Sequence, residues 1–341
     1  MESDRARLGR DGGVSSPQLL RILVSAAAAP QLAPQIGAVL AGRAHLLVTD
    51  EDAATDADLA FVSRDITGRS TKHEILPATQ RFYDALRSAA SLRWVHIHSA
   101  GADRAIFGEL RARGVEVTTS SGANADVVAQ TAVAGVLALA RHFPQYMAAQ
   151  RERRWAPPTG GVLPRDLRGQ RALIVGWGPV GQEIARLLQA LGLHCTAVRR
   201  QADATAAVPA IAYEDLAQAL PRTDWLVLAC PLSARTRGLV DAAALAALAP
   251  GARLVNVARG EVVVEADLVA ALQEGSLAGA FLDVFAHEPL PAASPLWMLD
   301  NVIVTPHAAG HSDANAQRVA AMFLDNLARW RDCVPLANRI P

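Results

Sequence analysis

The sequence predicts an α/β protein built from two domains with parallel β-sheets. The chain has 341 residues, which exceeds the size at which one hydrophobic core usually keeps growing, so two domains are the natural expectation. Apolar residues make up 51% of the chain, enough to fill two cores. Short β-rich runs also alternate with helical patterns along almost the whole sequence. That rhythm is typical of parallel strands joined by crossover helices.

Five β-rich runs lie in the first part of the chain: LLRILVS, HLLVT, LAFVS, LRWVHIHS and VEVTT. Helical patterns at residues 31–41, 81–88 and 104–113 separate them. Residues 125–141 are nearly all apolar and predict a long helix that is buried on most sides and runs between the domains. The segment 143–163 contains prolines, a Gly-Gly pair and several arginines without clear periodicity, so we expect an extended arm of the kind that often holds a second subunit.

A second alternation begins at residue 172 and contains six strand patterns: ALIVGWG, HCTAV, WLVLAC, RLVNVA, GAFLDV and NVIVTP. Six strands joined by helices are expected for a doubly wound dinucleotide-binding sheet. A last helix is predicted at residues 312–330, and we expect the tail VPLANRIP to return to the first domain. The predicted fold class is therefore α/β, with two doubly wound parallel-sheet domains.

The charge and cysteine content narrow the class of function. Lysine plus arginine equal aspartate plus glutamate at 33 each, so nothing indicates nucleic acid or an anionic membrane as partner, and a small molecule is expected. Cys195, Cys230 and Cys333 lack the spacing of a disulfide framework or a zinc site, which favours a reducing, cytoplasmic setting without metal. The first 17 residues do not read as a signal peptide and are expected to be a disordered lead, and no apolar run is long enough to span a bilayer.

The clearest motif is a glycine-rich turn, GWGPVG, between the apolar run ALIV and a helical pattern at residues 182–190. Its first glycine permits a tight turn, the second lets the backbone approach a pyrophosphate, and the third allows close packing of helix and sheet. The helix N-terminus adds unpaired N–H groups that favour an anion. The turn therefore predicts a dinucleotide site at Gly176, Gly178, Pro179, Val180 and Gly181.

The following strand indicates which dinucleotide to expect. In an NAD site this strand ends on an acidic residue that accepts a hydrogen bond from the ribose. Here HCTAV ends on Arg199 and Arg200, which can hold a 2′-phosphate by charge-assisted hydrogen bonds. NADP(H) is therefore the predicted cofactor. The alternative is that both arginines are solvated surface charges and that Asp203 serves NAD(H).

Arg259, Glu288 and His307 stand next to strand ends in the second half, and such ends face the ligand crevice of a parallel sheet. The three residue types match the needs of 2-oxo acid reduction. Arg259 can clamp a carboxylate with its planar fork, and His307 can give a proton to the carbonyl oxygen near neutral pH. Glu288 can orient that histidine and favour its charged form. Each residue alone also has an ordinary explanation as a surface, helix-terminal or loop residue.

The other histidines do not predict a metal site. His307 and His311 are four residues apart, but Gly310 interrupts any helix there and the HExxH pattern is not met. His96 and His98 share one face of a predicted strand, and two ligands are too few for a metal.

With these motifs in place, the sequence resembles the D-isomer-specific 2-hydroxyacid dehydrogenase family from about residue 19 onward. Agreement at many separated motifs argues against chance. The segments that carry the resemblance are HSAGAD (98–103), SSGANADVVAQTAVAGVLAL (120–139), GWGPVG (176–181), ACPLSARTRGLV (229–240), LVNVARGEVVVEADLVAAL (254–272), GAFLDVFAHEPLP (279–291) and NVIVTPHAAG (301–310).

The resemblance implies roles for individual residues. The three charged residues at the strand ends correspond to the family's catalytic triad, and Asp283 corresponds to an aspartate that contacts the nicotinamide carboxamide. The backbone of Ser99, Ala100 and Gly101 is implied to contact the substrate carboxylate. Further positions that line the cofactor by this resemblance are Pro231, Thr236, Val257 and Ala258.

The N-terminal motifs and the paired arginines look most like the family's glyoxylate and hydroxypyruvate reductase branch, which commonly prefers NADPH. This implies reduction of a small 2-oxo acid to the D-2-hydroxy acid. The individual acid stays open, because its side chain is expected to meet loops at residues 63–67 and 97–102. Gln130 departs from the family's usual glutamate and cannot take an ionic role. Glu288 argues against formate dehydrogenases, which resemble this sequence but carry glutamine there.

The family topology also implies how the domains are arranged. A Rossmann cofactor domain, residues 124–308, is inserted into a flavodoxin-like substrate domain, residues 1–123 and 309–341, and the arm at 143–163 is the expected contact of a homodimer. A rival interpretation is a nucleotide-sensing interaction protein, like the corepressors that share this fold. The intact triad disfavours it.

Overall fold

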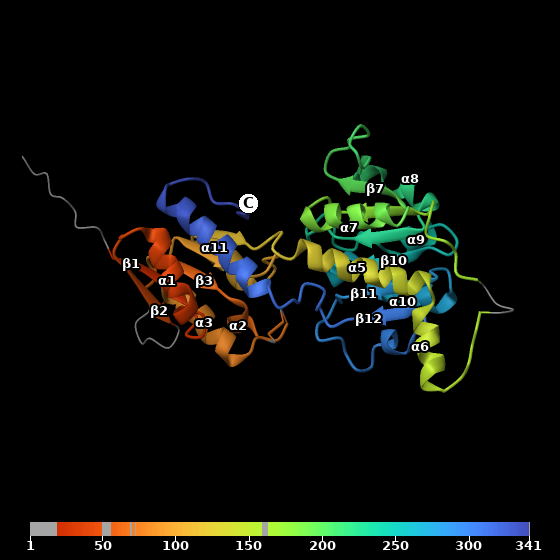
Figure 1. Cartoon of the computed structure of the whole chain (residues 1–341), viewed down its shortest axis with the longest axis horizontal. Coiled ribbons are helices and arrows are strands. Elements are labelled where there is room, and N and C mark those ends of the chain that lie inside the picture. Colours follow the sequence, from red (N-terminus) through yellow and green to blue (C-terminus); the bar gives the residue numbers. More distant parts are fainter. Residues whose placement is uncertain (1–18, 50–55, 69, 72, 159–162, 341) are drawn as a thin grey trace, which may run out of the picture.

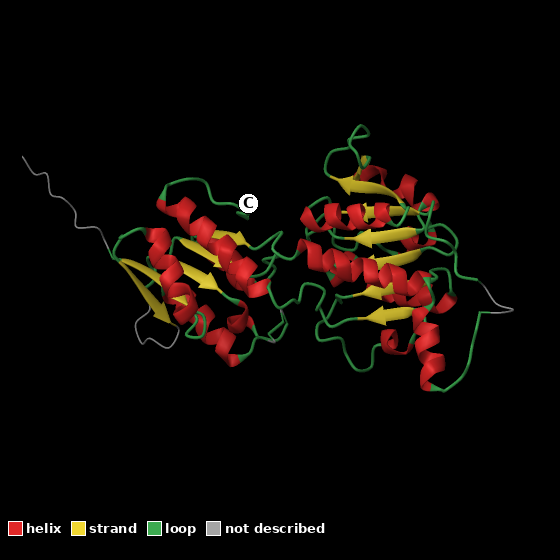
Figure 2. Ribbon diagram, viewed as in Figure 1, coloured by secondary structure: helices red, strands yellow, loops and turns green. Residues whose placement is uncertain are grey.

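The computed structural model describes residues 19–49, 56–68, 70–71, 73–158 and 163–340. Two parallel sheets lie side by side, each with its own helices (Figures 1 and 2). The predicted α/β class with two parallel-sheet units is therefore confirmed. The predicted N-terminal lead, residues 1–17, lies outside the described residues.

The first sheet has five strands in the order β2-β1-β3-β4-β5, all paired in parallel. All five strands predicted for the first part of the chain are confirmed: β1 (Leu20–Val24), β2 (His45–Thr49), β3 (Leu59–Val62), β4 (Trp94–Ile97) and β5 (Glu116–Thr119). The helices of this half are α1 (Ala29–Leu40), α2 (Arg64–Thr67), α3 (Pro77–Ser88), α4 (Ala105–Ala112) and the last helix, α11 (Asn315–Arg331).

The second sheet has seven strands in the order β12-β11-β10-β9-β6-β7-β8, where six were predicted. The missed strand is β8, a three-residue Ala-Ile-Ala edge strand beside β7 that is too short to give a periodic signal. The strands are β6 (Arg171–Val175), β7 (His194–Arg199), β8 (Ala210–Ala212), β9 (Trp225–Leu228), β10 (Arg253–Asn256), β11 (Gly279–Leu282) and β12 (Val302–Val304).

Helices of the second half cover both faces of its sheet. They are α5 (Ala125–Ala140), α6 (Phe143–Arg151), α7 (Pro179–Ala190), α8 (Leu216–Ala219), α9 (Ala242–Ala246) and α10 (Glu265–Glu274), with short 3-10 helices η1 (Tyr213–Asp215), η2 (Leu220–Arg222), η3 (Gly260–Val262) and η4 (Pro295–Met298).

Helix α5 is the long apolar helix that the sequence predicts, and it packs along the second sheet rather than between the domains. It lies against α7, β10 and β11. Gly135 permits this closeness, because a Cβ atom there would lie 2.4 Å from the ring of Phe281 on β11. The first turns of α5 lie beside the segments that link the two halves of the fold (Figure 1), and the Thr131 hydroxyl donates there to the Ala309 carbonyl (3.1 Å).

The predicted extended arm is partly wrong, because its first nine residues form helix α6. Pro144 lies in the first turn, where its missing N–H costs no helical hydrogen bond. The rest of the arm carries Trp155, which is 94% exposed, and its residues 159–162 lie outside the described part. No single helix among the described residues is long and apolar enough to cross a membrane. Helices α5 and α6 pass that length and composition test only as a pair, with a 70° bend between them.

The C-terminal segment completes the first half of the fold. Helix α11 packs Val319, Phe323 and Leu327 into the core under β1, β3 and β4. The tail then runs along β5, where Thr119 N–H donates to the Asn338 carbonyl (3.0 Å) and the Ile340 N–H donates to Val117 (2.9 Å). The predicted return of the tail is therefore confirmed. The domain boundaries at 123/124 and 308/309 stay a prediction.

Candidate active site

The glycine-rich turn connects β6 to α7 at the carboxyl edge of the second sheet. Gly176 has φ +105°, and a Cβ atom there would lie 2.6 Å from the Ala229 carbonyl oxygen. A Cβ atom on Gly181 would lie 2.1 Å from the Gly176 oxygen. By contrast, no atom lies within 4 Å of the Cβ position of Gly178, the N-cap of α7. The first and third glycines are therefore enclosed by protein, while the second faces open space that fits a pyrophosphate.

Arg199 and Arg200 lie at the end of β7, next to the glycine turn. Arg199 pairs with Ala212 of β8, and Arg200 is exposed in the following bend. Asp203, the alternative ribose acceptor, is engaged in its own turn. Its carboxylate accepts from the Thr205 hydroxyl (2.9 Å) and N–H (3.1 Å), and these hydrogen bonds lower its pKa.

Arg235 is a further cation at this end of the sheet, and the sequence reasoning missed it. It comes from the loop after β9 and lies over the ring of Tyr213, 5.7 Å from its centroid. Burial raises the pKa of Tyr213 to about 12, while the charges of Arg235 and Arg200 act in the opposite direction. Both arginines therefore lie near Tyr213. Glu214 pairs with Arg235 at 3.2 Å.

The other predicted cofactor residues follow β9 and β10. The buried hydroxyl of Thr236 donates to the Pro231 carbonyl (2.7 Å), which holds this loop together. Val257 N–H bonds to Leu228, and Ala258 N–H bonds to the Asn256 side chain (3.0 Å). These segments therefore lie along the same carboxyl edge as the glycine turn.

Arg259 follows β10 and reaches the first half of the fold. Its Nε donates to Asp103 Oδ2 (2.5 Å), and its Nη1 donates to the Ala258 carbonyl (2.7 Å). A Cβ atom on Gly101 would lie 1.9 Å from Arg259 Nη2, so the guanidinium lies directly on this turn. The Ser99 hydroxyl donates to the Gly101 carbonyl (2.7 Å) and closes the turn. The structure thus brings Arg259 and the predicted carboxylate-binding turn together.

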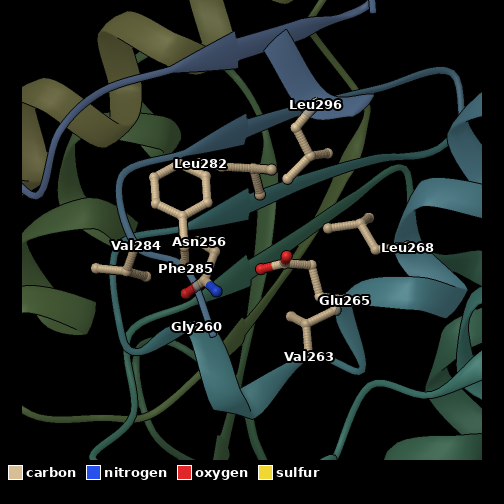
Figure 3. A pocket seen from close by; sticks show the side chains of 9 residues that line it. All are labelled: Asn256, Gly260, Val263, Glu265, Leu268, Leu282, Val284, Phe285 and Leu296. Carbon is tan, nitrogen blue, oxygen red and sulfur yellow. The ribbon is translucent and has the colours of Figure 1, made fainter. Parts of the chain in front are cut away.

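Gly260 allows the loops after β10 and β11 to touch. A Cβ atom on Gly260 would lie 1.8 Å from the carbonyl carbon of Phe285, so the loops after β10 and β11 are in backbone contact. Beside this contact, Asn256, Glu265 and apolar side chains line a cavity of about 10 Å³ (Figure 3). That volume holds one water at most. The cavity is therefore a packing feature under the site and no ligand pocket.

His307 and Glu288 form a hydrogen-bonded pair. His307 Nδ1 lies 2.8 Å from Glu288 Oε2, and the other carboxylate oxygen accepts from the Phe285 N–H (3.1 Å). The Glu288 side chain is 13% exposed and that of His307 is 48% exposed. Because Nδ1 faces the carboxylate, Nε2 is the ring nitrogen directed away from it. The first half of the fold also contacts this loop, since the Thr71 hydroxyl donates to the Glu288 carbonyl (2.9 Å).

Asp283 is buried and organises the loop that carries His307. Its carboxylate accepts from the Thr305 hydroxyl (2.6 Å) and from the N–H groups of Ala308 (2.8 Å) and Ala309 (3.1 Å). The His307 N–H donates to the Asp283 carbonyl (2.8 Å). This structural role was missed from the sequence, and the implied nicotinamide contact stays a prediction.

His98, Arg64 and His311 lie close together in the first half of the fold. His98 Nε2 lies 2.9 Å from the Thr67 hydroxyl, and Arg64 contacts His311 Nε2. Burial lowers the pKa of His98 to about 4, and the charge of Arg64 acts in the same direction. Burial likewise lowers the pKa of His311.

Gln130, where the family usually has glutamate, is exposed on α5. Within the described ranges, no three His, Cys, Asp or Glu side chains are grouped to hold a metal ion.

A glycine-rich strand-turn-helix in a parallel sheet, with an arginine and a histidine–carboxylate pair at the same edge, is the arrangement expected of a dinucleotide-dependent enzyme. Comparison with known proteins identifies which kind. The model for the D-isomer specific 2-hydroxyacid dehydrogenase NAD-binding domain matches residues 133–309. The chain therefore belongs to this family and is an NAD(P)-dependent 2-hydroxyacid dehydrogenase.

Individual relatives agree on the family and differ in substrate. The chain is 32% identical over 248 residues to a glyoxylate reductase from Thermofilum pendens, covering 72% of this chain and 73% of that protein. It is 34% identical over 240 residues to an (S)-sulfolactate dehydrogenase from Chromohalobacter salexigens, covering 70% and 77%. The crystal structure of a family member from Xanthobacter autotrophicus Py2 with NADPH and MES has a TM-score of 0.75 at 31% identity, covering 94% and 98%.

Proposed function

We propose that this enzyme reduces a small 2-oxo acid of the glyoxylate or hydroxypyruvate type to the D-2-hydroxy acid, with NADPH as hydride donor. One observation carries the proposal. Arg259 lies on the turn at Gly101, while His307 is bonded to Glu288 at 2.8 Å. The candidate carboxylate clamp thus follows β10 and the candidate proton donor follows β12, at the same carboxyl edge of one sheet, as 2-oxo acid reduction needs.

Each residue has a defined task in this reaction. A bound nicotinamide would supply the hydride for the carbonyl carbon. Arg259 and the backbone of the turn at residues 99–101 hold the substrate carboxylate. His307 gives the proton on Nε2 to the carbonyl oxygen, and Glu288 at Nδ1 stabilises the charged imidazolium before transfer. In the reverse direction, neutral His307 takes that proton back.

NADP(H) preference is supported by the cations near the end of β7. Arg199, Arg200 and Arg235 supply three guanidinium groups, and the Asp203 carboxylate already accepts hydrogen bonds from Thr205. Arg199→Asp combined with Arg200→Ala should weaken NADPH binding and improve NADH relative to it, because the change removes phosphate partners and restores an acceptor. An unchanged preference would mean that the 2′-phosphate is bound elsewhere.

The substrate is tested with a panel of 2-oxo acids, each with NADPH and NADH. We expect the highest kcat/KM for glyoxylate or hydroxypyruvate with NADPH, and D-glycerate as the product from hydroxypyruvate. Faster reduction of 3-sulfopyruvate or phosphohydroxypyruvate would replace the proposed substrate by that acid and would leave the enzyme class unchanged. Tight NADPH binding without turnover of any 2-oxo acid would favour the nucleotide-sensing interaction protein.

We also propose that the arm at residues 143–163 contacts a second copy of the chain. Phe143 and Met147 on α6 and Trp155 beyond it are exposed, and Trp297 and Met298 on η4 are exposed as well. Gln145 on α6 donates to the Asp300 carbonyl (3.1 Å), which ties the helix to the η4 region. Apolar exposure of this kind marks an interaction surface. Sedimentation should give a dimer for the wild type, and Met147→Asp with Trp155→Asp should shift it to a monomer.

A further inference from the structure

Asp103 contacts the one guanidinium that the proposed function uses to hold substrate, and nothing in its sequence context predicted this. The two residues are 156 positions apart, yet Arg259 Nε donates to Asp103 Oδ2 at 2.5 Å. The side chains are 22% and 30% exposed. Asp103 comes from the loop after β4 and Arg259 from the loop after β10. The ion pair therefore joins the two halves of the fold inside the candidate site.

The pair limits how Arg259 can hold a carboxylate. A guanidinium has five N–H groups, of which Nε and one on Nη1 are occupied by Asp103 and the Ala258 carbonyl. The edge formed by Nε and Nη2 is therefore blocked for a bidentate substrate. The end formed by Nη1 and Nη2 keeps donors, and Nη2 lies on Gly101. Only this end can meet a carboxylate that also contacts the turn.

The absence of a side chain at Gly101 makes the arrangement possible. A Cβ atom there would lie 1.9 Å from Arg259 Nη2 and 3.0 Å from Asp103 Oδ2. Turn, guanidinium and carboxylate are thus in mutual contact. An arginine without such a partner would sample many rotamers and lose that freedom on binding substrate. Asp103 restricts this freedom before the substrate arrives.

We propose that Asp103 is a positioning residue that fixes Arg259 so that its Nη1–Nη2 end faces the substrate carboxylate. The proposal rests on the role of Arg259 in the proposed function. The opposite possibility is that Asp103 occupies the guanidinium in place of the substrate and must be displaced. The two predict opposite changes in KM when the negative charge is removed.

The test is Asp103→Asn, which keeps the shape and an acceptor oxygen but loses the charge, with Asp103→Ala as the stronger change. We expect KM for glyoxylate to rise about tenfold in Asp103→Asn and further in Asp103→Ala, because an amide oxygen lacks the negative charge that attracts the guanidinium, and alanine lacks the acceptor as well. The inhibition constant of oxamate, which has a carboxylate but is not reduced, should rise in parallel. The kcat and the dissociation constant of NADPH should stay within about threefold of wild type.

Glu109→Gln is the matched control. Glu109 on α4 accepts from Arg87 Nε at 2.8 Å, in an ion pair between two helices of the first half. It should leave KM and oxamate inhibition unchanged. A lower KM in Asp103→Asn would show competition and overturn the proposal, and so would an unchanged KM or a loss confined to kcat. If Arg259→Lys also kept wild-type KM and oxamate inhibition, the clamp in the proposed function would fail as well; if it lost both, only the role of Asp103 would be wrong.

Discussion

The two sheets have the same parallel architecture but keep their polar residues in different places. In the five-stranded sheet, polar side chains are buried within the strands, and His96 on β4 lies between the hydroxyls of Thr118 (2.8 Å) and Ser120 (3.0 Å). In the seven-stranded sheet, the buried strand residues are apolar except Asn256 at the end of β10, and the candidate catalytic residues Arg259, Glu288 and His307 follow beyond the strand ends. The second sheet thus has the charged residues of the candidate site beyond its strands, while the first holds a titratable histidine within a strand.

The largest expected effect comes from a charge at the second sheet's edge. Arg259→Lys should lower kcat/KM for the preferred 2-oxo acid on the order of 100-fold, because a point ammonium cannot bond Asp103 and present a planar fork at once. Steady-state kinetics measures the loss, with Arg87→Lys on the first half as the control. A variant within threefold of wild type would remove Arg259 from the clamp role.

The first sheet should instead respond through stability at low pH. Burial lowers the pKa of His96 to about 3 and that of His98 to about 4, from an ordinary value of 6.5. Unfolded histidines bind protons near pH 6.5 while these two do not, so their contribution is complete above that pH and is lost as pH falls toward 4. The loss is at most about 1.4 kcal/mol per pH unit for each histidine.

Replacing one of the two histidines separates their contributions. His98→Asn should reduce the pH dependence of the free energy of unfolding by about half between pH 6.5 and 4, because His96 remains. Urea unfolding at several pH values measures this. Equal slopes for wild type and variant would mean that His98 does not stay neutral in the folded protein.

A smaller effect is expected where the charge acts through a neighbour. Glu288→Gln can still bond His307 Nδ1 but supplies no negative charge, so reduction should fall off at lower pH than in wild type. Oxidation of the hydroxy acid should persist to lower pH, because it needs the neutral ring. Glu265→Gln is the control, since Glu265 bonds Ala286 N–H (3.0 Å) in the same loop region. If the pH profiles of Glu288→Gln and wild type overlay while His307→Ala is inactive, His307 keeps its role and the proposed role of Glu288 is ruled out.

The smallest predicted effect concerns the cofactor end of the second sheet. Arg235→Ala should raise KM for NADPH about fivefold and leave NADH unchanged, because an exposed cation contributes modestly to phosphate binding. Calorimetry with 2′,5′-ADP provides a readout without turnover. Arg237→Ala is the neighbouring control, as Arg237 lies 4.0 Å from Glu261. Equal losses for NADPH and NADH would assign Arg235 to the nucleoside instead of the phosphate.

The regular elements followed from local pattern, and the exceptions have physical reasons. Apolar runs between helical patterns predicted every strand of the first sheet. Strand β8 was not predicted, because Ala-Ile-Ala is too short to show a pattern and is extended because it pairs with β7. Helix α6 was not predicted, because its first turn contains Pro144 and its sequence mixes polar and apolar residues without a clear apolar face.

The candidate site was predictable where residues follow strands directly. Arg259, Glu288 and His307 were singled out on that ground, and their catalytic roles remain predictions. The Asp103 contact could not be read from the sequence, because it depends on how two loops 156 residues apart approach each other. Arg235 was overlooked beside Thr236 for a similar reason, since its neighbour Tyr213 belongs to η1, a separate element after β8.

The position of α11 determines the order in which the chain can fold during synthesis. Phe323 stacks on Phe61 with ring centroids 4.6 Å apart, in a core that also contains Trp94. The ribosome releases the whole second sheet before it releases Phe323. The seven-stranded unit can therefore complete its core while the five-stranded unit still exposes apolar surface. The five-stranded unit is thus the part of the chain that is exposed to aggregation until the last helix emerges.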